Sequence, residues 1–298
     1  MRLHPQRSIP FLTEVYHSLN WFENRTVVIA TRHAKEKVIS PMLETHFRMQ
    51  VILPENFDSD AFGTFGGEVE RPDDALNTLR LKCIAAMQAA NCDLGIGSEG
   101  SFGPHPFFGF ACAGEELMML IDQKNQLEIT VSMICPETNF SGSQIEDVNQ
   151  LEAFAERAQF PSHALILRNA KGGVEMILKG LNDRTKLLSA YELIGNRYGS
   201  VYAETDMRAM YNPTRMKAIG RLTQKLIEKI KCECPECGTP GFEVRESIRG
   251  LPCRVCNVPT RSALVHLYAC SKCNCIREKK YPHGKESEDA TFCDMCNP

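Results

Sequence analysis

The chain has 298 residues, of which 43% are hydrophobic and 24% charged, and its formal net charge is −3. Length and composition are those of a globular protein with one large domain or two smaller ones. The lack of a global basic charge argues against a general nucleic-acid-binding protein. No stretch approaches the ~20 consecutive apolar residues of a membrane helix, so we expect no membrane partner.

The first hundred residues predict alternating strands and helices. Residues 26–31 form a short apolar, β-branched run typical of a buried strand, and a helix is expected at 34–47. A second short strand is expected at 50–53. Apolar side chains recur every three to four positions over residues 71–91, which indicates a helix. The strand expected at 93–98 should end in a glycine-rich loop over residues 98–106.

The middle of the chain continues this mixed pattern up to a boundary near residue 231. We expect antiparallel strands at 107–113, 116–121 and 127–134. These are followed by helices at 143–158 and 184–194, and by strands at 164–167 and 200–204. The last helix, at 213–230, begins with proline in its first turn. The predicted organisation is an α/β domain over residues 1–231 and a cysteine-rich domain over residues 232–298.

The cysteine-rich tail carries four CxxC pairs, which are Cys234/Cys237, Cys253/Cys256, Cys270/Cys273 and Cys293/Cys296. Two such pairs can close one tetrahedral four-cysteine zinc site. In chain order, 15 residues separate the first two pairs and 19 separate the last two, and both gaps are typical of zinc sites. We therefore expect two Zn²⁺ ions in two tandem zinc ribbons, with each pair joined to its neighbour in the chain. The competing arrangement is interleaved, with the first pair joined to the third and the second to the fourth.

The zinc ions are expected to be structural, because a ~30-residue unit cannot bury a sufficient apolar core by itself. Disulfides, free thiols or an iron–sulfur cluster are the alternatives. A disulfide framework suits a secreted chain, whereas the first residues show no export signal, so we expect a reducing, cytoplasmic location. The tail from residue 232 holds nine basic and nine acidic residues, which favours a protein contact over phosphate binding.

Three segments of the α/β domain combine groups that could bind phosphate or metal. The first is the turn after the first strand, where a helix begins next to several cations and can bind an anion. The second places Glu68 before a helix that carries Lys82, as a Mg²⁺-bound triphosphate would require. The third is the loop that contains Glu99, at the end of a strand where open α/β sheets bind ligands. A solvated turn, a charged helix face and a structural turn are the alternative interpretations.

The order of these segments resembles the pyrophosphatases of non-standard purine nucleoside triphosphates, namely the inosine/xanthosine triphosphatases and their Maf relatives. Residues 29–35 (IATRHAK) are similar to their opening LATxNxxK, and residues 81–86 (LKCIAA) to their K-A-x-A-A helix. Residues 98–103 (SEGSFG) stand where they carry D-D-S-G-L. Residues 213–218 (PTRMKA) resemble their S-H-R-x-K-A, which helps hold the base. The chain departs from the pattern at His33, at the single acid Glu99 and at Thr214.

The resemblance implies a mixed-sheet, inosine-triphosphatase-like domain and a metal-dependent nucleotide hydrolase. Glu68 and Glu99 would then be catalytic, with Mg²⁺ as cofactor. The implied substrate-binding residues are Thr31, Arg32, His33, Lys35, Lys82, Ser98, Ser101, Arg215 and Lys217. The whole chain also resembles an uncharacterised bacterial family that joins such a domain to a cysteine-rich tail. The alternatives are a non-catalytic zinc-ribbon protein that binds nucleic acid, a protein partner or a nucleotide, and a nucleotide sensor. A homodimer of the chain is a further alternative.

Overall fold

The computed structural model describes residues 21–55, 57–63, 74–105, 109 and 112–298. Their contacts divide the chain into two compact units. One unit, which we call the α/β unit, comprises Asn24–Lys229. The other, which we call the tail unit, contains Ile230–Pro298 together with residues 21–23. Each unit has its own sheets and is described separately.

The α/β unit is built around a five-stranded mixed sheet with the order β2-β1-β3-β4-β5. Its strands are β1 (Thr26–Ala30), β2 (Gln50–Ile52), β3 (Leu94–Pro104), β4 (Cys112–Asp122) and β5 (Leu127–Cys135). The strands β2, β1 and β3 are parallel, whereas β3, β4 and β5 run antiparallel to one another. The sheet therefore has one edge at which the carboxyl ends of parallel strands meet.

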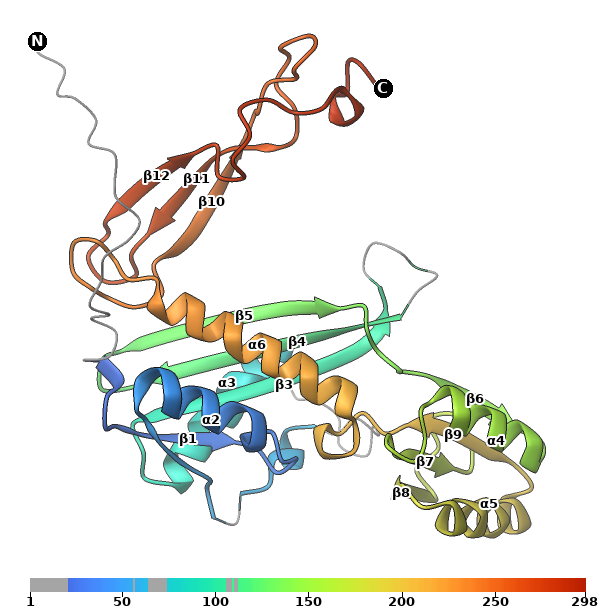
Figure 1. The fold of residues 1–298 in the computed structure, drawn as a ribbon. Helices are drawn as coiled ribbons and strands as arrows, with labels where there is room; N and C mark the ends of the chain where they lie inside the picture. Colours follow the sequence, from blue (N-terminus) through green and yellow to red (C-terminus); the bar gives the residue numbers. More distant parts are fainter. Residues whose placement is uncertain (1–20, 56, 64–73, 106–108, 110–111) are drawn as a thin grey trace, which may run out of the picture. The chain divides into compact units, whose positions relative to one another are not determined.

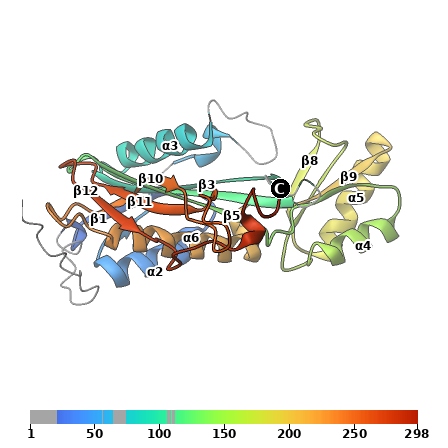
Figure 2. The same ribbon diagram turned by 90° about the horizontal axis from the view of Figure 1, so that it is seen from above.

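Helices cover both faces of this sheet, and they are α2 (Glu36–Phe47), α3 (Ala75–Ala89) and α6 (Pro213–Lys231). Helix α3 lies on one face, and α2 and α6 lie on the other (Figure 2). The contact with α3 is close because β3 carries glycine there. A Cβ at Gly95 would lie 2.5 Å from Met87 Cγ, and one at Gly97 would lie 2.6 Å from Cys83 Sγ. These glycines allow a helix to pack directly on the strand.

The predicted glycine-rich loop at residues 98–106 is wrong for most of its length. Strand β3 continues through Pro104, because it pairs with β4 residue by residue from Leu94↔Asp122 to Pro104↔Cys112. The sequence suggested a loop because glycine is common in turns, whereas here Gly100 stands in a strand and leaves room for the side chains of Arg215 and Glu116. The strand predicted at 107–113 falls largely outside the described residues, and β4 begins at Cys112.

A second, four-stranded antiparallel sheet completes the α/β unit, with the order β6-β9-β7-β8 (Figure 1). Its strands are β6 (Gly142–Ile145), β7 (Leu165–Arg168), β8 (Ile177–Leu181) and β9 (Val201–Thr205). Helices α4 (Val148–Arg157) and α5 (Arg184–Tyr198) share one apolar core with this sheet. The helix predicted at 143–158 begins later, because residues 142–145 pair with β9 and Asp147 caps α4. The sequence did not predict β8.

The tail unit contains a three-stranded antiparallel sheet of β10 (Glu243–Arg249), β11 (Ala263–Ala269) and β12 (Ile276–Lys280). Every residue of β10 and β12 is exposed and every residue of β11 is half-buried, so neither face of the sheet is covered by a core. The buried side chains of the unit gather around cysteines instead. In the described part of the chain, no helix is both long and apolar enough to cross a membrane.

Candidate metal centres and ligand cavity

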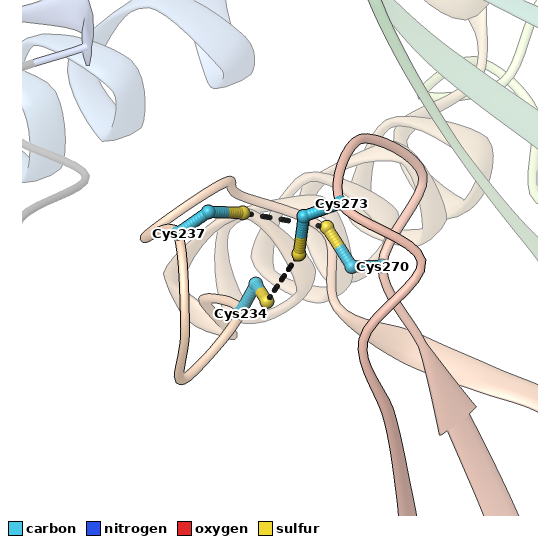
Figure 3. A group of neighbouring side chains, drawn as sticks. All are labelled: Cys234, Cys237, Cys270 and Cys273. Carbon is cyan, nitrogen blue, oxygen red and sulfur yellow. Dashed lines mark hydrogen bonds between the residues drawn. The ribbon is translucent and has the colours of Figure 1, made fainter.

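The eight cysteines of the CxxC pairs form two groups of four in the tail unit. The first group is Cys234, Cys237, Cys270 and Cys273 (Figure 3). The second is Cys253, Cys256, Cys293 and Cys296. Within each group, all sulfur atoms lie within 4.8 Å of one another. The predicted local pairing is therefore wrong: the first CxxC pair joins the third, and the second joins the fourth.

The strand register explains this interleaved arrangement. Glu243 at the start of β10 pairs with Ala269 at the end of β11, so the turns that carry the first and third CxxC pairs lie at the same end of the hairpin. The second CxxC pair follows the other end of β10. There Glu288, a few residues before the fourth pair, forms a bridge with Cys253. The spacing along the chain could not reveal which ends would meet.

The sulfur geometry fits a tetrahedral metal ion. Between CxxC turns, the Sγ–Sγ distances are 3.6 Å for Cys234–Cys273, 3.6 Å for Cys237–Cys270 and 3.5 Å for Cys256–Cys293. A tetrahedron with Zn–S bonds of about 2.3 Å has S–S edges of about 3.8 Å. A disulfide would need about 2.05 Å, and none of the 14 cysteines forms one. Both four-cysteine groups can hold zinc.

The CxxC turns share a backbone conformation that presents the sulfurs. In three of them the amide of the first cysteine donates to the carbonyl five residues later, at 2.9 Å for each of Cys234, Cys253 and Cys270. The residue after the second cysteine has a left-handed conformation, at Gly238, Asn257 and Asn274. Glycine and asparagine adopt it most easily. A glycine or asparagine follows all four CxxC pairs, which is a sequence signal for metal-binding turns beyond the cysteine spacing itself.

Within each four-cysteine group, one thiol has a lowered pKa, whereas hydrogen bonds among the cysteines raise the pKa of Cys273 and of Cys296 to about 12. The pKa of Cys237 is lowered to about 6, mainly by a hydrogen bond from the Thr239 hydroxyl. The pKa of Cys253 is lowered to about 7 by the backbone amides of Cys256 and Val255. Both shifts favour the thiolate, which is the form that binds zinc. Cys232, Cys275 and His283, which could have competed as ligands, belong to neither group.

In the α/β unit, Lys35 occupies the edge where parallel strands end. Its Nζ donates to the Ser98 carbonyl at 2.9 Å and to the Ser98 hydroxyl at 3.0 Å. Strand β1 ends at Ala30, which pairs with Gly97, so Ser98 lies just beyond the end of that pairing. The amine of Lys35 lies beside Ser98, beyond the last residue pair of β1 and β3. Open α/β sheets bind ligands at such an edge.

Two buried ion pairs flank Lys35. On the α3 face, Lys82 Nζ donates to Glu99 Oε2 at 2.5 Å. On the other face, Arg215 Nε donates to Glu116 Oε1 at 2.6 Å, above the space that Gly100 leaves by lacking a side chain. Burial lowers the pKa of Lys35 to about 7, and the nearby charges of Arg215 and Lys82 act in the same direction.

These five buried groups, which we call the charge cluster, comprise three cations and two carboxylates. The cluster contains four of the predicted site residues, Lys35, Lys82, Glu99 and Arg215, and a fifth, Ser98, accepts hydrogen bonds from Lys35. Glu116 was not predicted, although a charged residue within an apolar strand was a usable signal, because a buried charge needs a partner. Arg215 was predicted to contact substrate, and its guanidinium also donates to the Met207 carbonyl at 2.6 Å.

The remaining predicted residues lie elsewhere. Arg32 and His33 pair with Asp58 and Asp60, at 2.6 and 3.4 Å. Thr31 is buried and accepts a hydrogen bond from the His33 amide. Ser101 and Lys217 lie outside the charge cluster: Ser101 lines a separate small cavity, and Lys217 is exposed. Glu68 falls outside the described residues.

A cavity of about 490 Å³ lies next to the charge cluster. Its aromatic lining consists of Phe102, Phe140 and Tyr202, with Lys171 and Glu204 as charged groups. The Phe102 and Phe140 rings are stacked, with centroids 5.9 Å apart. The guanidinium of Arg215 lies 5.2 Å from the centroid of Phe102, so this ring lies between the cavity and the charge cluster, whose side chains do not line the cavity. The sequence did not predict this cavity.

The described residues do not fit the expected Mg²⁺ site. The carboxylates of Glu99 and Glu116 are both occupied by buried cations. In the described ranges, the two cysteine groups are the only clusters of three or more His, Cys, Asp or Glu ligand atoms. Magnesium prefers carboxylate and water oxygens.

Comparison with protein families matches residues 82–298 to a domain of unknown function, DUF6671. This match covers well over half of the chain. A comparison with curated proteins gives no match. Neither comparison shows similarity to the triphosphate pyrophosphatases.

Proposed function

The chain belongs to the DUF6671 family, and we propose that it is a zinc protein whose tail unit is folded by two structural Zn²⁺ ions. The observation that carries this proposal is the sulfur geometry of the two four-cysteine groups. Four protein ligands would leave no open coordination position, which is typical of structural zinc. The exposed sheet supports the same role, because it offers little apolar burial to stabilise the fold.

Metal analysis of the purified protein tests this proposal. We expect two zinc ions per chain and, after replacement by cobalt, the absorption spectrum of tetrahedral thiolate coordination. One ion or none per chain would contradict the proposal. Stoichiometric iron with the visible absorption of an iron–sulfur centre would contradict it as well.

We further propose that the α/β unit binds a nucleotide in the 490 Å³ cavity, with its phosphates toward the charge cluster. The cavity has the size of a small-molecule site. The stacked rings of Phe102 and Phe140 offer an aromatic surface for a base. When Lys35 is protonated, the charge cluster holds one more cation than carboxylate, so a bound anion would complete its balance and favour the protonated amine.

Hydrolysis of the nucleotide is a separate proposal, which rests on the resemblance to the pyrophosphatases. It would require a carboxylate free to bind metal, whereas Glu99 accepts from Lys82. We therefore propose binding as the function of the cavity, and we route no chemical step through Mg²⁺. If the chain does hydrolyse triphosphates, Glu99→Gln should abolish pyrophosphate release and leave nucleotide binding intact.

Calorimetric titration with inosine, xanthosine, adenosine and guanosine triphosphates, with and without Mg²⁺, tests both proposals. Phe102→Leu keeps an apolar side chain but removes the ring, so we expect affinity to fall about tenfold, the loss of one stacking contact. Leu193→Ala, on an exposed groove between β8 and α5, is the control and should bind normally. Absence of binding to every nucleotide, or equal affinities for the two variants, would contradict the binding proposal. Pyrophosphate measured in the same samples would detect hydrolysis independently.

A further inference from the structure

The two faces of the tail sheet differ sharply in chemistry. On one face, β11 presents His266 and Tyr268, whose partners on β12 are Lys279 and Arg277. Their partners on β10 are Ser247 and Val244. We call these six residues the aromatic face. Among the described residues of the three strands, no carboxylate belongs to this face.

The opposite face carries the acidic and aliphatic residues. There Val265, Leu267 and Ala269 pair with Ile248, Glu246 and Glu243 on β10. On β12 their partners are Lys280, Glu278 and Ile276. Side chains alternate along a strand. The three glutamates of the sheet therefore lie on this opposite face, whereas two of the three cations of β12, Arg277 and Lys279, lie on the aromatic face. A neutral tail therefore has one basic face.

The rings of the aromatic face lie in a row. His266 lies between Tyr268, at a centroid distance of 6.5 Å, and His283, at 5.3 Å. Phe242 stacks with Tyr268 at 5.8 Å, and it is buried against Cys234 and Cys270 of the first four-cysteine group. Phe242 therefore supports Tyr268 and is not itself accessible, whereas Tyr268 and His266 are half-buried and His283 is exposed.

We propose that the aromatic face binds single-stranded nucleic acid. Unpaired bases would stack on Tyr268 and His266, and the backbone phosphates would contact Arg277 and Lys279. Aromatic rings beside cations are the recurring means of binding single strands with little regard to base or sugar. Arg277 also pairs with Glu236 at 2.7 Å, but both side chains are about half exposed. Such a surface pair is weak and can yield to a phosphate.

The negative charge of the zinc-thiolate groups does not prevent this binding. The groups lie near the ends of strands of seven residues, which are ~23 Å long. The central pair His266–Lys279 is therefore ~10 Å from either end, about one Debye length at physiological salt, whereas Tyr268 and Arg277 lie closer to the first group. The proposal rests on the zinc-loaded fold, because Tyr268 packs against the cluster of Phe242 and the cysteines of the first four-cysteine group.

Two adjacent lysines provide a matched test. Lys279 pairs with His266 on the aromatic face, and Lys280 pairs with Val265 on the opposite face. Fluorescence anisotropy of the zinc-loaded full chain with labelled dT15 and rU15 should show binding to both oligomers. Lys279→Glu should weaken it severalfold and reduce the salt slope by about 0.7, the loss of one phosphate contact. Lys280→Glu makes the same change in net charge and should bind like the wild type.

Tyr268→Leu separates stacking from charge. It keeps apolar contact with Phe242 and should lower affinity by about tenfold or more. Zinc content measured on each sample shows whether a variant that binds weakly is still folded. A variant that holds two zinc ions and binds the oligomers more weakly supports the proposal. A zinc-loaded wild type that binds neither oligomer overturns it. So do equal losses for the two lysine variants, an unchanged Tyr268→Leu, or equal affinity for a duplex of the same length.

Discussion

At the scale of single residues, Lys35 is the group whose chemistry the fold changes most clearly. Its amine is buried at the end of β1, and its pKa is lowered to about 7 by burial and by the charges of Arg215 and Lys82. An unfolded lysine has a pKa of about 10.4. Folding therefore disfavours the protonated amine. The cost is full below pH 7, decreases between about pH 7 and 10, and is absent above that range.

The stability of the protein should reflect this titration. Relative to Lys35→Met, the wild-type free energy of unfolding should rise as the pH increases from 7 toward 10, because the unfolded chain binds a proton that the folded chain lacks. Urea unfolding of both proteins at several pH values measures the difference. Lys37→Met, an exposed position on the same helix, should show no such trend. A difference that is constant over this range would contradict the assigned pKa.

At the scale of secondary structure, the sequence predicted elements better than it predicted their contacts. The periodicity of residues 71–91 led to α3, and proline in the first turn marked the start of α6. The glycines at 100 and 103 suggested that β3 would end early, because a sequence does not show which helix will pack on a strand. Likewise, the CxxC motifs predicted the metal ligands but not their partners, since the hairpin of β10 and β11 decides which turns meet.

The candidate site was predicted to a similar extent. The motifs at 29–35, 81–86 and 98–103 named Lys35, Lys82, Ser98 and Glu99, which lie together in the structure. This expectation rested on the resemblance to the pyrophosphatases and on the position of the Glu99 segment at the end of a strand. Glu116 and the cavity ring Phe102 come from strands whose pairing was not predicted in register. Their roles depend on contacts with α6 and the second sheet, which no local pattern encodes.

The role of glycine in β3 can be tested with a matched pair of variants. Gly97→Ala places a Cβ 2.6 Å from Cys83 Sγ and 2.9 Å from Leu79 Cδ1, so α3 must shift. We expect a loss of about 1–3 kcal/mol in the free energy of unfolding. Gly103→Ala lies on the same strand with open space around it and should have little effect.

Chemical denaturation measures both, and the double variant Gly97→Ala/Cys83→Ala should recover part of the loss. Equal stabilities for the Gly97 and Gly103 variants would show that glycine in β3 does not serve helix packing.

At the scale of the whole molecule, the chain joins two units that are stabilised differently. The α/β unit has apolar cores around both of its sheets. The small cluster of the tail unit consists of cysteines and Phe242, with Tyr268 against it. Metal coordination therefore takes the place of a core in the tail.

Removal of zinc should consequently unfold one unit and spare the other. With a strong chelator, we expect the tail amides of residues 232–298 to lose their protection from hydrogen exchange, because apolar burial alone cannot hold them. Amides of β3 and β4 should remain protected. If tail protection is unchanged in protein shown to be free of metal, the tail does not depend on zinc.

The binding of two zinc ions by interleaved CxxC pairs can be tested with two fourfold serine variants. One replaces Cys234, Cys237, Cys270 and Cys273, and the other replaces Cys234, Cys237, Cys253 and Cys256. Interleaved pairing leaves one complete group in the first variant and none in the second. Measured zinc content should therefore be one ion per chain in the first and none in the second. The reverse result, with zinc retained only in the second variant, would establish local pairing and contradict the interleaved arrangement.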